Sequence, residues 1–98
     1  MKSRAFHPEA RAEFAEAALY YASIQSELGQ RFHNEMEPLI SEVRRMPGTF
    51  RFIRKPARRH FSHEFPQGII YVEQPDDIWI VAVMPLRRKP GYWTHRLD

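Results

Sequence analysis

Six consecutive apolar residues, at positions 78–83, constrain the fold of this chain more than any other segment. Most of them are β-branched, which favours a strand. Side chains alternate between the two faces of a strand, so a strand that is apolar throughout needs cover on both faces. Residues 69–73 show the same pattern, and the turn Gln74-Pro75-Asp76-Asp77 joins the two segments. The sequence therefore predicts two central antiparallel strands that are buried on both sides.

Two helices are predicted before these strands. Apolar residues recur at alternating intervals of three and four, which is typical of amphipathic helices. The two apolar stripes consist of Ala10, Phe14, Ala17, Tyr21, Ile24 and Leu28, then Phe32, Met36, Leu39, Val43 and Met46. His7-Pro8-Glu9 is typical of a helix start, and Gly29 marks the expected break between the helices. Pro38 lies inside the second helix, where it removes one backbone hydrogen bond and is expected to kink the helix.

The remaining segments complete a small sheet. Residues 58–65 alternate in character, residues 49–53 are short and half apolar, and residues 4–6 can add an edge strand. Short connections between the strands imply an antiparallel meander. A length of 98 residues leaves room for one domain, which we place at residues 1–98. The expected fold is α+β in two layers, with an N-terminal helical hairpin packed on one face of a small antiparallel sheet.

The second face of this sheet needs a cover of its own, because two helices cover only one face. The C-terminal tail, a second copy of the chain or a separate polypeptide can supply it. A large uncovered apolar face promotes aggregation. We therefore expect a tightly bound partner.

Charge is distributed unevenly along the chain. Residues 9–43 carry seven acidic and two basic residues, whereas residues 44–98 carry eleven basic and five acidic ones. The basic half indicates a surface that binds an anionic partner. There is no cysteine, which excludes disulfides and thiolate metal sites. His60 and His63 point to opposite faces of a strand, so no metal site and no cofactor are expected. No apolar segment approaches the length of a membrane span.

A basic and aromatic tail follows the apolar run. It contains Arg87, Arg88, Lys89, Tyr92, Trp93 and Arg96. Guanidinium groups bind phosphate, aromatic rings stack on bases, and a tyrosine hydroxyl can transfer a proton. A second basic cluster, residues 51–59, can contact a nucleic-acid backbone or an acidic partner. The tail can equally be structural, with its aromatic residues packed on the core and its cations in solvent.

Several short motifs occur in order along nearly the whole chain. They are Phe6-His7-Pro8-Glu9-Ala10, Tyr20-Tyr21, Leu28-Gly29-Gln30-Arg31-Phe32, Phe65-Pro66 before Ile69-Ile70-Tyr71, and the closing segment 80–93. In this order they resemble the RelE/ParE superfamily, the toxins of bacterial type II toxin–antitoxin modules that are often described as plasmid stabilisation proteins. The resemblance implies a cytoplasmic toxin with a helical hairpin on an antiparallel sheet.

The resemblance also implies a cognate antitoxin, whose C-terminal region wraps around the toxin. We expect this antitoxin to cover the sheet face that carries Ile70, Val72, Trp79 and Val81. Operator DNA is expected to be bound only through the antitoxin.

Two activities occur in the superfamily. RelE-like toxins cleave mRNA in the ribosome with basic residues and a C-terminal arginine and tyrosine, and ParE-like toxins poison DNA gyrase. For mRNA cleavage, the matching catalytic candidates are Arg59, Arg87 and Tyr92. Contacts to the nucleic acid or the target are expected from Arg58, Arg88, Lys89, Trp93 and Arg96.

This chain departs from the RelE-like pattern at several positions. Gly68 occupies a position where a basic residue is expected, and Phe61 and Ser62 replace expected lysines. Pro85 stands where many relatives carry histidine. These departures favour a gyrase poison. The alternatives are an mRNA endonuclease, which would make the chain an enzyme, and a non-toxic protein-binding module or degenerate toxin.

Overall fold

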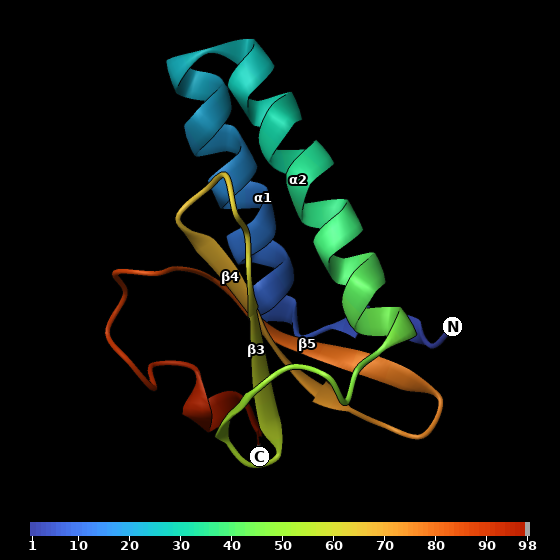
Figure 1. The fold of residues 1–98 in the computed structure, drawn as a ribbon. Helices are drawn as coiled ribbons and strands as arrows, with labels where there is room; N and C mark the ends of the chain where they lie inside the picture. The colour runs from blue at the N-terminus through green and yellow to red at the C-terminus, as the bar shows by residue number, and fades with distance from the viewer. Residues whose placement is uncertain (98) are drawn as a thin grey trace.

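The computed structural model describes residues 1–97 and has two layers, a helical hairpin and a sheet (Figure 1). Strand β1 (Ser3–Phe6) precedes helices α1 (Pro8–Ile24) and α2 (Ser26–Arg45). Strands β2 (Phe52–Arg54), β3 (Ala57–Phe61), β4 (Gln67–Glu73) and β5 (Asp77–Pro85) follow, and a short 3-10 helix, η1 (Thr94–Leu97), closes the described part. The α+β fold with N-terminal helices that the sequence predicts is therefore confirmed.

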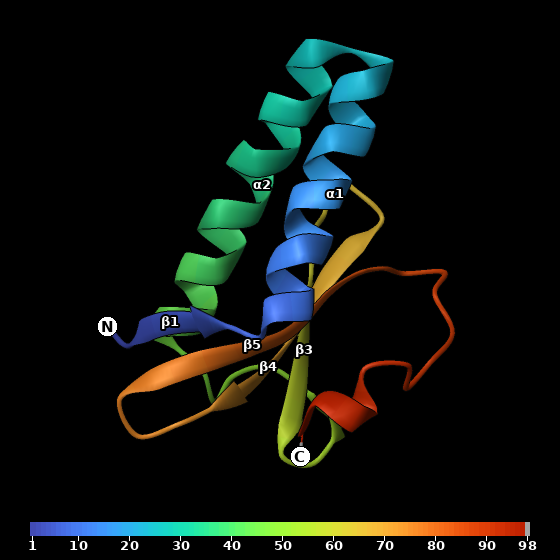
Figure 2. The same cartoon turned by 180° about the vertical axis from the view of Figure 1, so that it is seen from behind.

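The five strands form one sheet in the order β1-β5-β4-β3-β2. Strands β2 to β5 pair antiparallel, as expected, and the edge strand at residues 4–6 is present. That edge strand, however, runs parallel to β5, from Ser3 opposite Asp77 to Phe6 opposite Ile80. The sheet is therefore mixed rather than fully antiparallel. Figures 1 and 2 show that the hairpin lies on one face of the sheet and that its tip extends past it.

The break between the helices lies at Gln25 and not at the predicted Gly29. Helix α1 begins as expected, because the His7 side chain accepts a hydrogen bond from the Glu9 backbone N–H at 3.0 Å. Gly29 is inside α2, where it allows close approach of the two helices. A Cβ atom added there would lie only 2.7 Å from the Ala22 Cβ.

The main core lies between the helices and the sheet. Strands β4 and β5 contribute Ile69, Tyr71, Ile78, Ile80 and Val83 to it, and α2 contributes Phe32, Met36, Leu39, Ile40 and Val43. The Tyr71 hydroxyl donates to the Pro47 carbonyl at 2.6 Å, and burial raises the pKa of Tyr71 to about 12. Every large apolar position on the helix-facing side of the central strands is thus buried.

The C-terminal tail covers the opposite face of the sheet. A bulge in β5, opposite Ile70 and Tyr71 of β4, leaves Val81 unpaired and places both Val81 and Ala82 in a second buried cluster. Trp93, which is only 3% exposed, packs into this cluster. The tail is one of the three covers that the sequence left open. Because it covers this face, the apolar strands alone do not require a partner, and the expected partner stays a prediction.

Gly29→Ala should destabilise the protein by about 1 kcal/mol, even though alanine favours helices by about as much. The new methyl group would overlap the Ala22 side chain and push the helices apart. Urea unfolding measures the change, with Gly48→Ala as the control because nothing lies within 4 Å of that position. A Gly29→Ala protein that is more stable than the parent would contradict this packing.

Candidate functional site

The carboxylate of Glu13 joins helix α1 to strand β5 and to the tail. Its Oε1 accepts a hydrogen bond from the Val83 backbone N–H at 3.0 Å, and its Oε2 accepts from the Tyr92 hydroxyl at 2.7 Å. The two terminal nitrogens of Arg96 donate to the same two oxygens at 2.9 and 3.0 Å. We call these four residues the Glu13 network.

Arg96 is buried, with 6% of its surface exposed. Besides Glu13 it donates to the Val81 carbonyl at 3.1 Å, and its Nε lies 2.8 Å from Glu9 Oε2. That last contact is an ion pair whose angle does not suit a hydrogen bond. The sequence predicted that Arg96 contacts nucleic acid or the target. The structure places its guanidinium inside the protein, bound to Glu13, and the contact stays a prediction.

The Glu13 network perturbs the titration of its members. Burial would raise the pKa of Glu13, but hydrogen bonds from Arg96, Tyr92 and Val83 outweigh burial, and the pKa is lowered. The pKa of Tyr92 is raised, first by burial and then by its hydrogen bond to the Glu13 carboxylate. Glu13 is therefore held charged and Tyr92 is held neutral.

The environment of Tyr92 does not suit proton abstraction. Its hydroxyl donates to Glu13, and the Arg88 guanidinium lies 3.9 Å from the centre of its ring. A general base needs a pKa near the working pH, and the raised pKa of Tyr92 lies further from it. Tyr92 thus links the tail to helix α1 through Glu13, and its catalytic role stays a prediction.

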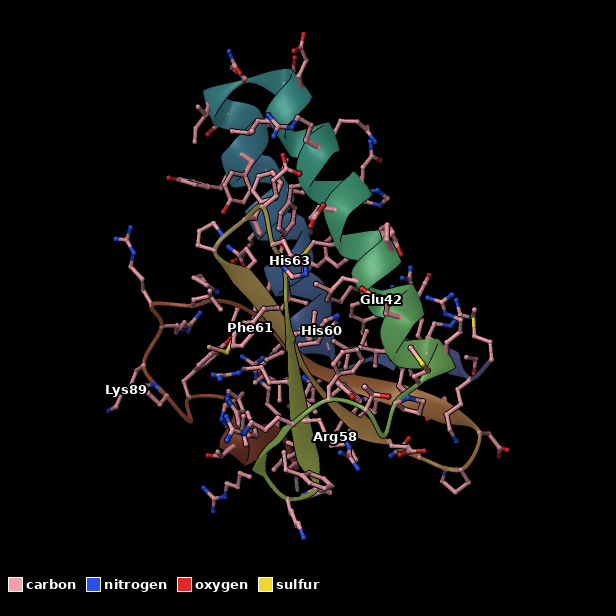
Figure 3. The ribbon with its side chains drawn as sticks, in the orientation of Figure 1. Glu42, Arg58, His60, Phe61, His63 and Lys89 are labelled. Carbon is pink, nitrogen blue, oxygen red and sulfur yellow. The ribbon has the colours of Figure 1, made fainter. Side chains whose placement is uncertain are left out.

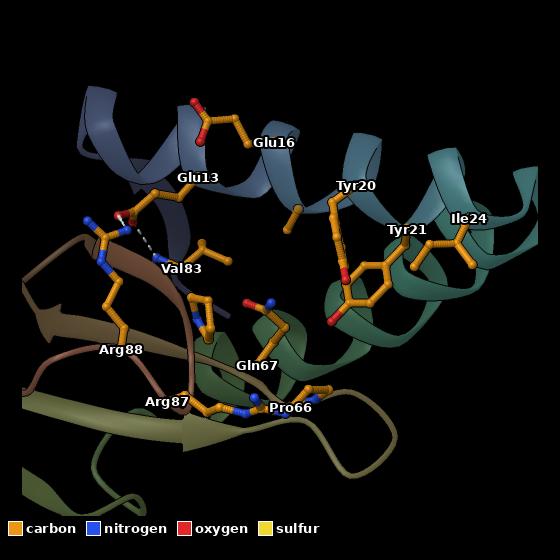
Figure 4. Close-up of a pocket in the computed structure, with 12 residues that line it drawn as sticks. Glu13, Glu16, Tyr20, Tyr21, Ile24, Pro66, Gln67, Val83, Arg87 and Arg88 are labelled. Atoms are coloured by element: carbon orange, nitrogen blue, oxygen red, sulfur yellow. Dashed lines mark hydrogen bonds and ion pairs between the residues drawn. The ribbon is translucent and has the colours of Figure 1, made fainter.

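A groove runs between α1 and the adjoining ends of β4 and β5 (Figure 4). Its volume is about 560 Å³. We call it the α1–β5 groove. Helix α1 forms one wall with Glu13, Glu16, Ala17, Tyr20, Tyr21 and Ile24, and the other wall consists of Pro66, Gln67, Val83, Pro85, Arg87 and Arg88. The groove therefore combines an aromatic helix face with a rim of arginines.

Three predicted tail residues stay exposed. Arg87 and Arg88 line the groove, and Arg88 also lies 3.8 Å from Glu13. Lys89 lies on the outer part of the wide loop that carries the tail away from β5 (Figure 3). These cations are available to an anionic partner, unlike Arg96.

The basic residues of β3 lie on opposite faces of the sheet, because Arg58 pairs with Tyr71 of the main core and Arg59 pairs with Ile70 of the cluster beneath the tail. Arg58 donates to the Phe50 carbonyl at 2.8 Å and lies 3.7 Å from the centre of the Phe52 ring. Arg59 lies 4.2 Å from the centre of the Phe61 ring. Neither arginine lines the α1–β5 groove. Arg87 and Arg88 line the groove, and Arg88 also contacts the Tyr92 ring and Glu13, which links Tyr92 to this region of the tail.

His60 has a structural environment. It stacks on Phe50 with ring centres 3.8 Å apart, and its Nε2 lies 3.3 Å from Glu42 Oε1. Figure 3 shows His60 and Phe61 directed to opposite sides of β3. In residues 1–97 no three His, Cys, Asp or Glu side chains are placed to hold a metal ion. No helix in the same range is long and apolar enough to cross a membrane.

The face expected to bind an antitoxin is largely occupied. Ile70 and Val81 are buried beneath the tail, and Val72 and Trp79 are half-buried beside the same cluster. Trp93, predicted as a target contact, is itself part of that cluster. The tail would have to leave before Ile70 or Val81 could touch another protein.

Sequence reasoning missed Glu13 and Gln67. A signal for Glu13 was present, because it lies three residues after Ala10 and four before Ala17, an acidic residue within the apolar stripe. Gln67 was read only as part of a turn. Its position, two residues before Ile69 on the helix-facing side of β4, was the signal that could have identified it.

Glu13→Gln should lower the free energy of unfolding by about 2–3 kcal/mol at neutral pH, because it leaves the buried Arg96 charge without its partner. The pKa of Glu13 is lowered on folding, so its contribution is fully present above the ordinary value of 4.5. It is lost as the pH falls through the folded value. The difference between parent and variant, measured by urea unfolding, should therefore shrink in acid.

Glu16→Gln is the matched control, since Glu16 is exposed on the same helix. It should leave stability unchanged at every pH. Equal losses in the two variants would contradict the special role of Glu13, as would a Glu13→Gln effect that does not change with pH.

Comparison with known proteins assigns no family. No protein-family model matches this chain, and a search against curated proteins found no match. The function must therefore be inferred from the Glu13 network, the groove and the motifs of the sequence.

Proposed function

We propose that this chain is the toxin of a bacterial type II toxin–antitoxin module and acts in the cytoplasm as a ParE-like poison of DNA gyrase. A cognate antitoxin would hold it inactive. The toxin class is supported by the resemblance of the motifs to the RelE/ParE superfamily. The helical hairpin on a small sheet is consistent with the fold that this resemblance implies.

The observation that favours gyrase over mRNA is the hydrogen bond from the Tyr92 hydroxyl to Glu13. It engages the tyrosine that an mRNA endonuclease would need for proton transfer. Arg59 is not among the residues that line the groove with Arg87, and its guanidinium packs on the Phe61 ring.

Gly68 supports the same choice. A Cβ atom at this position would lie 3.0 Å from the His60 carbonyl oxygen and 3.2 Å from the Phe61 ring. A basic side chain expected there in an mRNA endonuclease would have to displace its neighbours. The residue type at this position is thus tied to the packing of β3 against β4.

Tightly controlled expression of the chain alone should arrest growth and cause DNA breaks while transcripts stay intact. Tyr92→Phe should retain this toxicity, because its hydroxyl has a structural partner rather than a substrate. Growth curves, DNA topology on gels and mapping of transcript ends provide the three measurements. Arg54→Ala, a substitution of an exposed arginine on β2, is the control for general effects of lost charge.

Each alternative predicts a different result. Cuts at codon positions in mRNA, abolished by Tyr92→Phe, would establish the endonuclease and reject gyrase as the target. Normal growth with verified folded protein would reject toxicity and leave a binding module or a degenerate toxin.

A further inference from the structure

We propose that the α1–β5 groove is a binding site for a short extended peptide segment of another protein, one that carries a bulky apolar residue and an acidic residue. This inference goes beyond the proposed function, because it requires the groove and not toxicity. It concerns a different surface from the sheet face beneath the tail.

Gln67 provides the first argument. The residue is 6% exposed, and its side-chain Oε1 has no hydrogen-bond partner among residues 1–97. Figure 4 shows its amide directed into the space between α1 and the strands. Buried polar atoms are nearly always paired, so this acceptor needs a donor that residues 1–97 do not supply. A backbone N–H of an extended segment is such a donor.

The apolar wall of the groove provides the second argument. Tyr20 is 62% exposed and Ile24 is 56% exposed, although both are large apolar side chains. They continue the wall formed by Ala17 and Tyr21. From Glu13 to Ile24 the wall is about 16 Å long at 1.5 Å per residue. That length suits about five residues of extended chain.

The charges on the two walls provide the third argument. Arg87 is exposed at the rim and forms no ion pair within residues 1–97. The α1 wall carries the exposed Glu16 and the charged Glu13. An acidic residue of the segment would pair with Arg87. A nucleic-acid strand would meet the α1 carboxylates along its length, which favours a peptide over a polyanion.

Selection from a phage-displayed library of random peptides, on protein made by cell-free synthesis, supplies the probes. The enriched peptides should share an acidic and a bulky apolar residue within about five positions of each other. Synthetic labelled copies are then titrated by fluorescence anisotropy. A uridine-rich RNA oligonucleotide is titrated in parallel.

Gln67→Met should weaken peptide binding about fivefold through loss of one hydrogen bond. Arg87→Ala should weaken it about tenfold through loss of a charge-assisted contact. Arg54→Ala, on the far edge strand, should leave the affinity unchanged. The melting temperature of Gln67→Met should not fall, because its Oε1 has no partner to lose and its backbone bonds to Phe65 and Ser62 remain.

The proposal is overturned if no peptide is enriched, or if the enriched peptides bind both groove variants as well as the parent. Loss of stability in Gln67→Met without loss of binding would show that Gln67 is structural and bound only to water. Binding of the RNA that depends on Arg87 and competes with the peptides would make the groove a nucleic-acid site instead.

Discussion

The ionic contact between Glu13 and Arg96 holds together layers that lie on opposite sides of the sheet. Helix α1 covers one face and the tail covers the other, so their contact must pass around an edge. It does so where β1 has ended, because β1 pairs with β5 only as far as Phe6 and Ile80. Beyond that point β1 offers no acceptor to the Val83 N–H, and the Glu13 carboxylate accepts its hydrogen bond instead. The early start of α1 at Pro8 therefore creates the gap through which the tail is anchored.

The contribution of this contact is mainly geometric. A buried ion pair often adds little net stability compared with apolar packing, since both charges lose their hydration. The burial of Trp93 and its apolar neighbours favours a covered sheet face. The hydrophobic effect is not directional, however, so it does not fix the path that the tail takes across that face. The bonds from Arg96 and Tyr92 to Glu13 select one path for the tail. They also fix the far end of the loop that displays Arg87 and Lys89, so the exposed cations project from a segment anchored at both ends.

The sequence was sufficient where apolar residues form a clear local pattern. Both helices show apolar stripes with a regular period, and the central strands show continuous apolar runs. The prediction that Gly29 ends the first helix was wrong, because Gly29 allows Ala22 of the other helix to approach closely. A glycine that ends a helix and a glycine that lets two helices pack closely cannot be told apart in the sequence. The contacts of the candidate site could not be predicted from the sequence for a related reason. Glu13 and Arg96 are 83 residues apart, and Gln67 is defined by a partner that it lacks, so neither feature leaves a periodic pattern.

The parallel pairing of β1 with β5 has a consequence for the order in which the fold can form. Strand β1 can pair only after residues 77–80 are present, because they form its partner strand. The tail is anchored only when Arg96 binds Glu13. Before the tail docks, Ile70 and Val81 lie uncovered on the far face of the sheet, because Trp93 belongs to the cluster that buries them.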